Sequence, residues 1–126
     1  GTAIMEKNTG GLLDALREIG VEVDKTLSRF GDDSSEIYIK FLKRFPDEDR
    51  ITPIKDAVSE NDLEKLSQTA HKLKGVSANL GMTALSESAH VLELKAKNGS
   101  AEGADMDIKL IEKLNGDICR IIRENA

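Results

Sequence analysis

The sequence predicts an all-α protein, an up-and-down antiparallel four-helix bundle preceded by one or two short N-terminal helices. No stretch of the 126 residues alternates apolar and polar side chains with the period of two that strands need. Apolar residues instead recur at three- and four-residue steps, in segments separated by short links rich in glycine and asparagine. Short links favour antiparallel neighbours. The length suits a single domain with one core, over residues 1–126.

The N-terminal part is predicted to hold the short helices. Residues 1–8 are expected to be flexible, or in part a remnant of cloning. A helix is predicted from about residue 10 to residue 19, where Gly20 stops it. A second short helix is predicted over residues 24–30.

A longer helix follows, begun by a serine at position 34 or 35 and carrying most of the aromatic residues. All four aromatic residues lie between Phe30 and Phe45, so this segment is expected to supply the bulkiest part of the core. Pro46 should end or kink the helix near Phe45. Thr52 and Pro53 then resemble the N-cap and first position of a new helix, which reaches about residue 59.

Three helices make up the rest of the chain. The first runs from Leu63 to Leu80, capped within residues 61–62 and stopped by Gly81. Its inward stripe is Leu63, Leu66, Ala70, Leu73, Ser77 and Leu80. Thr83 is predicted to cap the next helix, which extends to about residue 97. The last helix carries apolar residues from Ile108 to Ile122.

His71 lies in the first of these three helices but outside its inward stripe. At about 100° of turn per residue it sits roughly 130° from the centre of the stripe, so it should point at solvent. Lys74 lies one turn further on, and Gly75 stands where a side chain would otherwise flank the imidazole. Glycine in a helix interior costs about 1 kcal/mol relative to alanine. This pattern indicates a phosphorylatable histidine presented to a docking protein, although an exposed histidine alone is usually a polar surface residue.

The segment Ala70-His71-x-Leu73-Lys74-Gly75-x-Ser77-Ala78-x-Leu80-Gly81 resembles the signature of histidine-containing phosphotransfer (HPt) domains of two-component relays. The resemblance implies that His71 carries a phosphoryl group, that Lys74 helps to hold it and that Gly75 makes room for a response regulator. Ser67, Gln68 and Ala78 are predicted to join Gly75 in docking that partner. The implied partners are response-regulator receiver domains, with a hybrid histidine kinase as a further candidate. The receiver is expected to bring Mg²⁺, and no cofactor of the chain's own is expected.

Glu93 is a candidate to orient the imidazole. Glu93 comes twelve residues after Gly81, and His71 comes ten residues before Gly81. In an antiparallel hairpin, Glu93 and His71 therefore lie within about one helical turn of each other along the helix axes. Glu93 also lies about 70° off the inward stripe of its own helix, on the flank that faces Lys74 and His71. Its carboxylate could accept a hydrogen bond from Nδ1–H and leave Nε2 as the nucleophile. HPt domains often carry Gln or Glu at the comparable place. The alternative is a solvated glutamate.

Global properties exclude several classes of function. A formal net charge of -5 is not that of an evident nucleic-acid binder. No apolar run approaches the roughly 20 residues of a membrane span, so no membrane partner is expected. Cys119 is the only cysteine, which fits a reducing compartment, and a cytoplasmic monomer is expected. His71 and His90 are nineteen residues apart with no cysteine nearby, which argues against a metal site.

Three function classes remain open. The first is a phosphotransfer module that exchanges a phosphoryl group between His71 and receiver aspartates. The second is the phosphoacceptor domain of a larger histidine kinase, and the third is a helical-bundle adaptor that acts only by binding. No glycine-rich phosphate loop with the Gly-x-x-x-x-Gly-Lys spacing is present, so ATP-dependent kinase activity of its own is not expected.

Overall fold

The computed structural model describes residues 11–31 and 35–125, and the prediction for residues 1–8 lies outside them. Residues 11–18 are helical. The helices after them are α2 (Val23–Phe30), α3 (Ser35–Arg44), the 3₁₀ helix η1 (Phe45–Asp47), α4 (Ile51–Ser59), α5 (Leu63–Asn79), α6 (Thr83–Lys97) and α7 (Ala104–Asn125). No residue of the two described ranges lies in a strand. The all-α prediction is confirmed.

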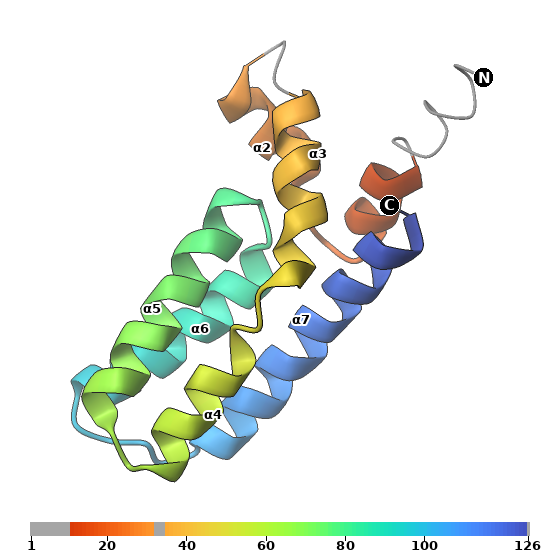
Figure 1. Ribbon diagram of the computed structural model, residues 1–126. Coiled ribbons are helices and arrows are strands. Elements are labelled where there is room, and N and C mark those ends of the chain that lie inside the picture. The colour runs from red at the N-terminus through yellow and green to blue at the C-terminus, as the bar shows by residue number, and fades with distance from the viewer. Residues whose placement is uncertain (1–10, 32–34, 126) are drawn as a thin grey trace.

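The helices α4 to α7 form the bundle (Figure 1). Each packs on its two neighbours in the order α4, α5, α6, α7 and back to α4, and the α5–α6 pair is the most extensive. Helix α7 also contacts η1 and α3, so α3 and α4 lie one after the other along it as two parts of an interrupted helix. Residues 11–18 and α2 are then the two short helices that come before the bundle in the chain. Within the described residues, no helix is long and apolar enough to cross a membrane.

The interruption between α3 and α4 lies at Pro46, as predicted, because proline cannot donate to a preceding carbonyl. The predicted cap of α4 is wrong. Helix α4 begins at Ile51, and the Asp49 carboxylate accepts hydrogen bonds from the backbone N–H of Ile51 and of Thr52, both at 3.0 Å. Proline is tolerated at position 53 because the N–H groups of a first turn have no partner within the helix.

The two ends of α5 follow the prediction closely. The Asp62 carboxylate accepts a hydrogen bond from the backbone N–H of Lys65 at 3.0 Å, and the helix ends at Asn79. The predicted stripe faces the core, with Leu66, Ala70, Leu73, Ser77 and Leu80 buried and Leu63 half-buried.

The start of α6 differs from the prediction. Met82, not Thr83, occupies the N-cap position of α6, with no side-chain cap. Met82 is 1% exposed, so filling the core at this turn outweighs the preference for a polar cap. Helix α7 begins at Ala104, four residues before the first predicted core position, with Asp105 and Asp107 in its first turn where the helix dipole favours acidic groups.

The N-terminal helices close over the turn between α5 and α6. The backbone N–H of Glu22 donates to the carbonyl oxygen of Gly81 at 2.9 Å, and the Tyr38 hydroxyl donates to that of Leu80 at 2.8 Å. Burial raises the pKa of Tyr38 to about 12. Gly81 has a φ of 78°, and a Cβ there would meet Thr26 Oγ1 and lie 2.9 Å from the carbonyl oxygen of Glu22. This position therefore requires glycine.

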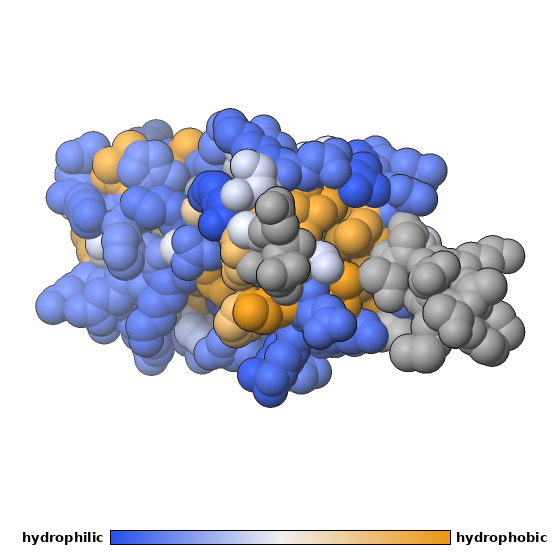
Figure 2. Space-filling view, turned by 90° about the horizontal axis from the view of Figure 1, so that it is seen from above, coloured by the Kyte–Doolittle hydropathy of each residue, from blue (hydrophilic) through white to orange (hydrophobic). Residues whose placement is uncertain are grey.

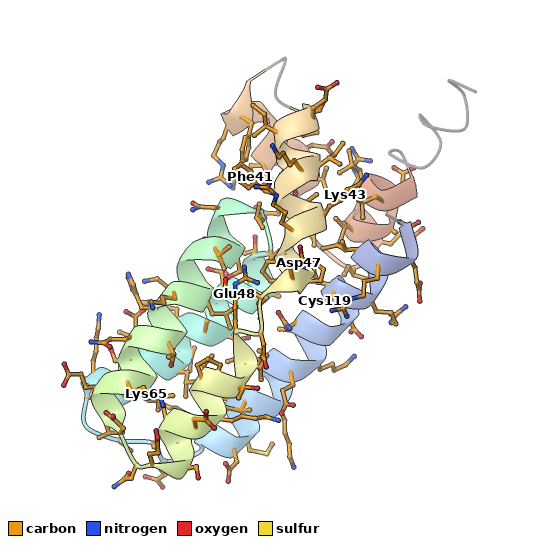
Figure 3. The ribbon with its side chains drawn as sticks, in the orientation of Figure 1. Phe41, Lys43, Asp47, Glu48, Lys65 and Cys119 are labelled. Carbon is orange, nitrogen blue, oxygen red and sulfur yellow. The ribbon has the colours of Figure 1, made fainter. Side chains whose placement is uncertain are left out.

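The aromatic segment is only partly in the core. Tyr38 and Phe45 are fully buried, as expected. Phe41 and Ile37 are 46% and 49% exposed, so the expectation that this whole segment is core is wrong for these two residues. Phe41 and Lys43 project from opposite sides of α3 (Figure 3). The side of α3 that carries Phe41 is thus an exposed apolar surface.

Candidate functional site

His71 stands near the middle of α5, and its side chain is 63% exposed. The inward stripe of α5 packs in the core, which turns the imidazole outward. The prediction that His71 points at solvent is confirmed.

Glu93, on α6, lies against His71. Its Oε2 is 2.8 Å from Nδ1 of the imidazole, and its side chain is 1% exposed. The predicted contact is present, and the alternative of a solvated glutamate is wrong. Because an ionised carboxylate only accepts hydrogen bonds, this contact assigns the proton to Nδ1. The other ring nitrogen, Nε2, then carries the free electron pair.

Three further groups surround the Glu93 carboxylate. Lys97 Nζ lies 3.0 Å from Oε2, while Lys74 Nζ and His90 Nδ1 lie 3.1 Å and 3.5 Å from Oε1. Burial by itself would raise the pKa of Glu93, but the donors of Lys97, Lys74, His71 and His90 outweigh it and lower the pKa to about 2. Glu93 is therefore ionised at neutral pH, which the assignment of the His71 proton requires.

A hollow of about 350 Å³ adjoins the imidazole. It is lined by Ser67, Gln68, His71, Lys72, Glu93 and Lys97. Two of the predicted docking residues, Ser67 and Gln68, thus share the hollow with His71. The other two, Gly75 and Ala78, lie outside it, one and two turns further along α5.

Gly75 has no packing reason to be glycine. A Cβ built on it would have nothing within 4 Å, among the residues that the structure describes. The bare backbone beside His71 is therefore open surface, as the docking hypothesis requires.

A comparison with protein families matches the Hpt domain model to residues 40–121, more than half of the chain. The chain belongs to the Hpt domain family. The matched segment runs from α3 into α7, and it includes both His71 and Glu93. No curated protein and no solved structure matches the chain. Hpt domains work by histidine phosphotransfer in two-component signalling, so this is the class of function of the chain.

Sequence reasoning missed two members of the Glu93 cluster in this Hpt domain. His90 lies beside Oε1 of Glu93, a contact that the sequence analysis did not predict. Lys97 was not singled out. The available signal was spacing, since both residues lie on α6, three before and four after Glu93, and such neighbours share one helix face.

The cluster can position a nucleophile and balance charge at this Hpt site. Glu93 holds the imidazole by Nδ1, and the exposed ring presents Nε2 to an incoming group. Lys74 and Lys97 place their ammonium groups at the same carboxylate. Within residues 11–31 and 35–125, no three His, Cys, Asp or Glu side chains are grouped so that they could hold a metal ion.

Proposed function

We propose that this Hpt domain accepts a phosphoryl group from the aspartate of one receiver domain on Nε2 of His71 and passes it to the aspartate of another. The observation that carries the proposal is the 2.8 Å contact between Glu93 Oε2 and His71 Nδ1 on a ring that is 63% exposed. This contact combines a defined tautomer with an accessible nucleophile.

The transfer is an in-line displacement at phosphorus. The electron pair on Nε2 forms the N–P bond while the bond between phosphorus and the aspartate oxygen breaks, and that electron pair returns to the carboxylate. The proton stays on Nδ1, so the phosphorylated ring carries a positive charge that the Glu93 carboxylate neutralises. The reverse displacement, by the carboxylate of the next receiver, restores the neutral imidazole. No water or additional proton donor is consumed.

Lys74 and Lys97 would supply charge to the phosphoryl group. Their side chains are 29% and 57% exposed, so both ammonium groups reach the surface that carries the imidazole. Lys74 is the more buried of the two and is the one that the family pattern assigns to this role. Its cation should stabilise the phosphoryl oxygens in the transition state and in phosphohistidine.

The receiver would dock over α5 around the imidazole. Ser67 and Gln68 lie on one side of His71, while Gly75 and Ala78 lie on the other. The receiver is expected to bring the Mg²⁺ ion and the remaining catalytic carboxylates. We also propose that the protein is a cytoplasmic monomer and that a hybrid histidine kinase is a further partner. We expect it to bind neither nucleic acid nor a membrane.

The test is phosphoryl transfer from radiolabelled, phosphorylated receiver domains, followed on a gel. The native chain should gain label that is labile in acid and stable in base. His71→Gln should gain none while its melting temperature stays within about 2 °C, because an exposed side chain contributes little stability. His90→Gln, which removes the only other histidine, is the matched control and should still be labelled. Acid-labile label on His71→Gln would refute the assignment, and receiver binding without label on the native chain would favour an adaptor.

A further inference from the structure

A second and larger cavity, of about 470 Å³, lies away from the imidazole where α2 and α3 meet the end of α5. Its wall includes three phenylalanines and three arginines: Phe30, Phe41, Phe45, Arg29, Arg44 and Arg50. The last turns of α5 complete it through Val76 and Leu80. Val76 is five residues after His71 and about 140° further round the helix, so this cavity and the imidazole face different directions.

Part of the apolar wall is open to solvent. Phe41 is 46% exposed and its ring centroid lies 6.4 Å from that of Phe30, which makes a continuous aromatic surface. Figure 2, which looks onto the end of the molecule that carries α2 and α3, shows hydrophobic residues at the surface between hydrophilic ones. Exposed aromatic surface in a concavity of this size is typical of ligand sites, whose volumes run from about 300 to 1,000 Å³.

The arginines differ in what they already bind. The Arg50 guanidinium donates to the carbonyl oxygen of Phe45 at 2.7 Å and pairs with Glu48 at 3.0 Å. Arg44 has no ion pair or hydrogen bond with another side chain in the part of the chain that the structure describes. Arg29 has no ion pair there, and its one hydrogen bond is a 3.4 Å contact to a backbone carbonyl oxygen. Two guanidinium groups at the cavity are therefore available to an anion.

We propose that this cavity binds a small amphipathic anion, with an aromatic or aliphatic body against Phe30 and Phe41 and an acidic head group between Arg29 and Arg44. Guanidinium groups pair with carboxylates and phosphates in the same two-bond geometry, so both head groups fit the chemistry. The apolar body supplies the affinity, because burying it removes the exposed face of Phe41 from water. This proposal goes beyond the phosphotransfer function and does not depend on it.

The experiment uses the fluorescent probe anilinonaphthalene sulfonate, an aromatic anion, on the folded chain. We expect saturable binding with one site per chain, with competition by decanoate and decyl phosphate and much weaker competition by uncharged decanol. The better of the two anionic competitors identifies the head group. Phe41→Ala and Arg44→Gln should each weaken probe binding about tenfold, which corresponds to the loss of one charge-assisted or well-buried contact.

Two matched controls separate this site from general binding to a helical bundle. Lys43→Gln removes a cation from the opposite side of α3, and Leu110→Ala removes an apolar side chain that is 49% exposed on α7. Both should bind the probe as the native chain does. Absence of saturable binding, or equal loss in the controls, would overturn the proposal. It would also be overturned if Arg44→Gln weakened only the binding of a receiver domain, since the surface would then belong to a protein partner.

Discussion

The charge of Glu93 should contribute measurably to the stability of the fold, and Glu93→Gln tests this directly. Glutamine keeps the size of the side chain and one oxygen that can accept from Nδ1 of His71. It removes the negative charge at which Lys74 and Lys97 converge. We therefore expect the variant to fold, but with a smaller free energy of unfolding at neutral pH.

The magnitude follows from the pKa of Glu93, which is lowered from 4.5 to about 2. At 1.36 kcal/mol per pKa unit this corresponds to at most about 3 kcal/mol. The side chains of Lys97 and His71 are 57% and 63% exposed, so solvent screens these contacts and reduces the contribution to about 1 to 2 kcal/mol. For a domain of this size, Glu93→Gln should lower the melting temperature by about 4 to 8 °C at pH 7.

The pH dependence separates a charge effect from a packing effect. Because the pKa is depressed in the folded state, the contribution of Glu93 is fully present above pH 4.5 and is lost as the pH falls toward about 2. Urea unfolding of the native chain and of Glu93→Gln, measured at several pH values from 7 to 2.5, should give free energies of unfolding that converge at the acid end.

The matched control is Glu87→Gln, on the same helix, whose carboxylate has no ion pair or hydrogen bond among the described residues. This variant should unfold like the native chain at every pH. A difference between the native chain and Glu93→Gln that is the same at pH 7 and at pH 2.5 would refute the reasoning, because it would mean that the shape of Glu93 and not its charge stabilises the fold.

Four further substitutions give distinct expectations. Lys74→Ala should slow transfer from a receiver by about 10- to 100-fold and lower the melting temperature by less than Glu93→Gln does, because Lys97 and His71 stay at the Glu93 carboxylate. Equal transfer rates would show that Lys74 has no part in the transfer. Gly75→Leu should stabilise the helix by up to about 1 kcal/mol yet slow transfer about tenfold or more, since its side chain would occupy open docking surface; full transfer would exclude the docking role. Gly81→Ala should destabilise the fold by more than about 2 kcal/mol, because its Cβ would lie 2.9 Å from the carbonyl oxygen of Glu22. Gly99 has a similar φ of 82° but open space around it, so Gly99→Ala should cost only the backbone strain of a left-handed alanine, about 1 to 2 kcal/mol. Equal losses in the last pair, measured by urea unfolding, would show that the clash is absent.

Helical periodicity alone predicted the bundle and the exposure of His71. The stripe of α5 and the outward position of the imidazole depend only on about 3.6 residues per turn, which is a local property of the chain. The hairpin estimate also placed Glu93 at the correct height and on the correct flank of α6. It succeeded because α5 and α6 are adjacent in sequence and joined by a turn too short to allow another arrangement.

The tertiary structure alone decided what surrounds these residues. It buried the Glu93 carboxylate and set Glu22 and Thr26 against Gly81. It also left Phe41 half exposed above a cavity, although its spacing in α3 is that of a core residue. These features depend on how far each helix is rotated and shifted against helices distant in the sequence. Packing of the whole core sets those shifts, and no local period encodes them.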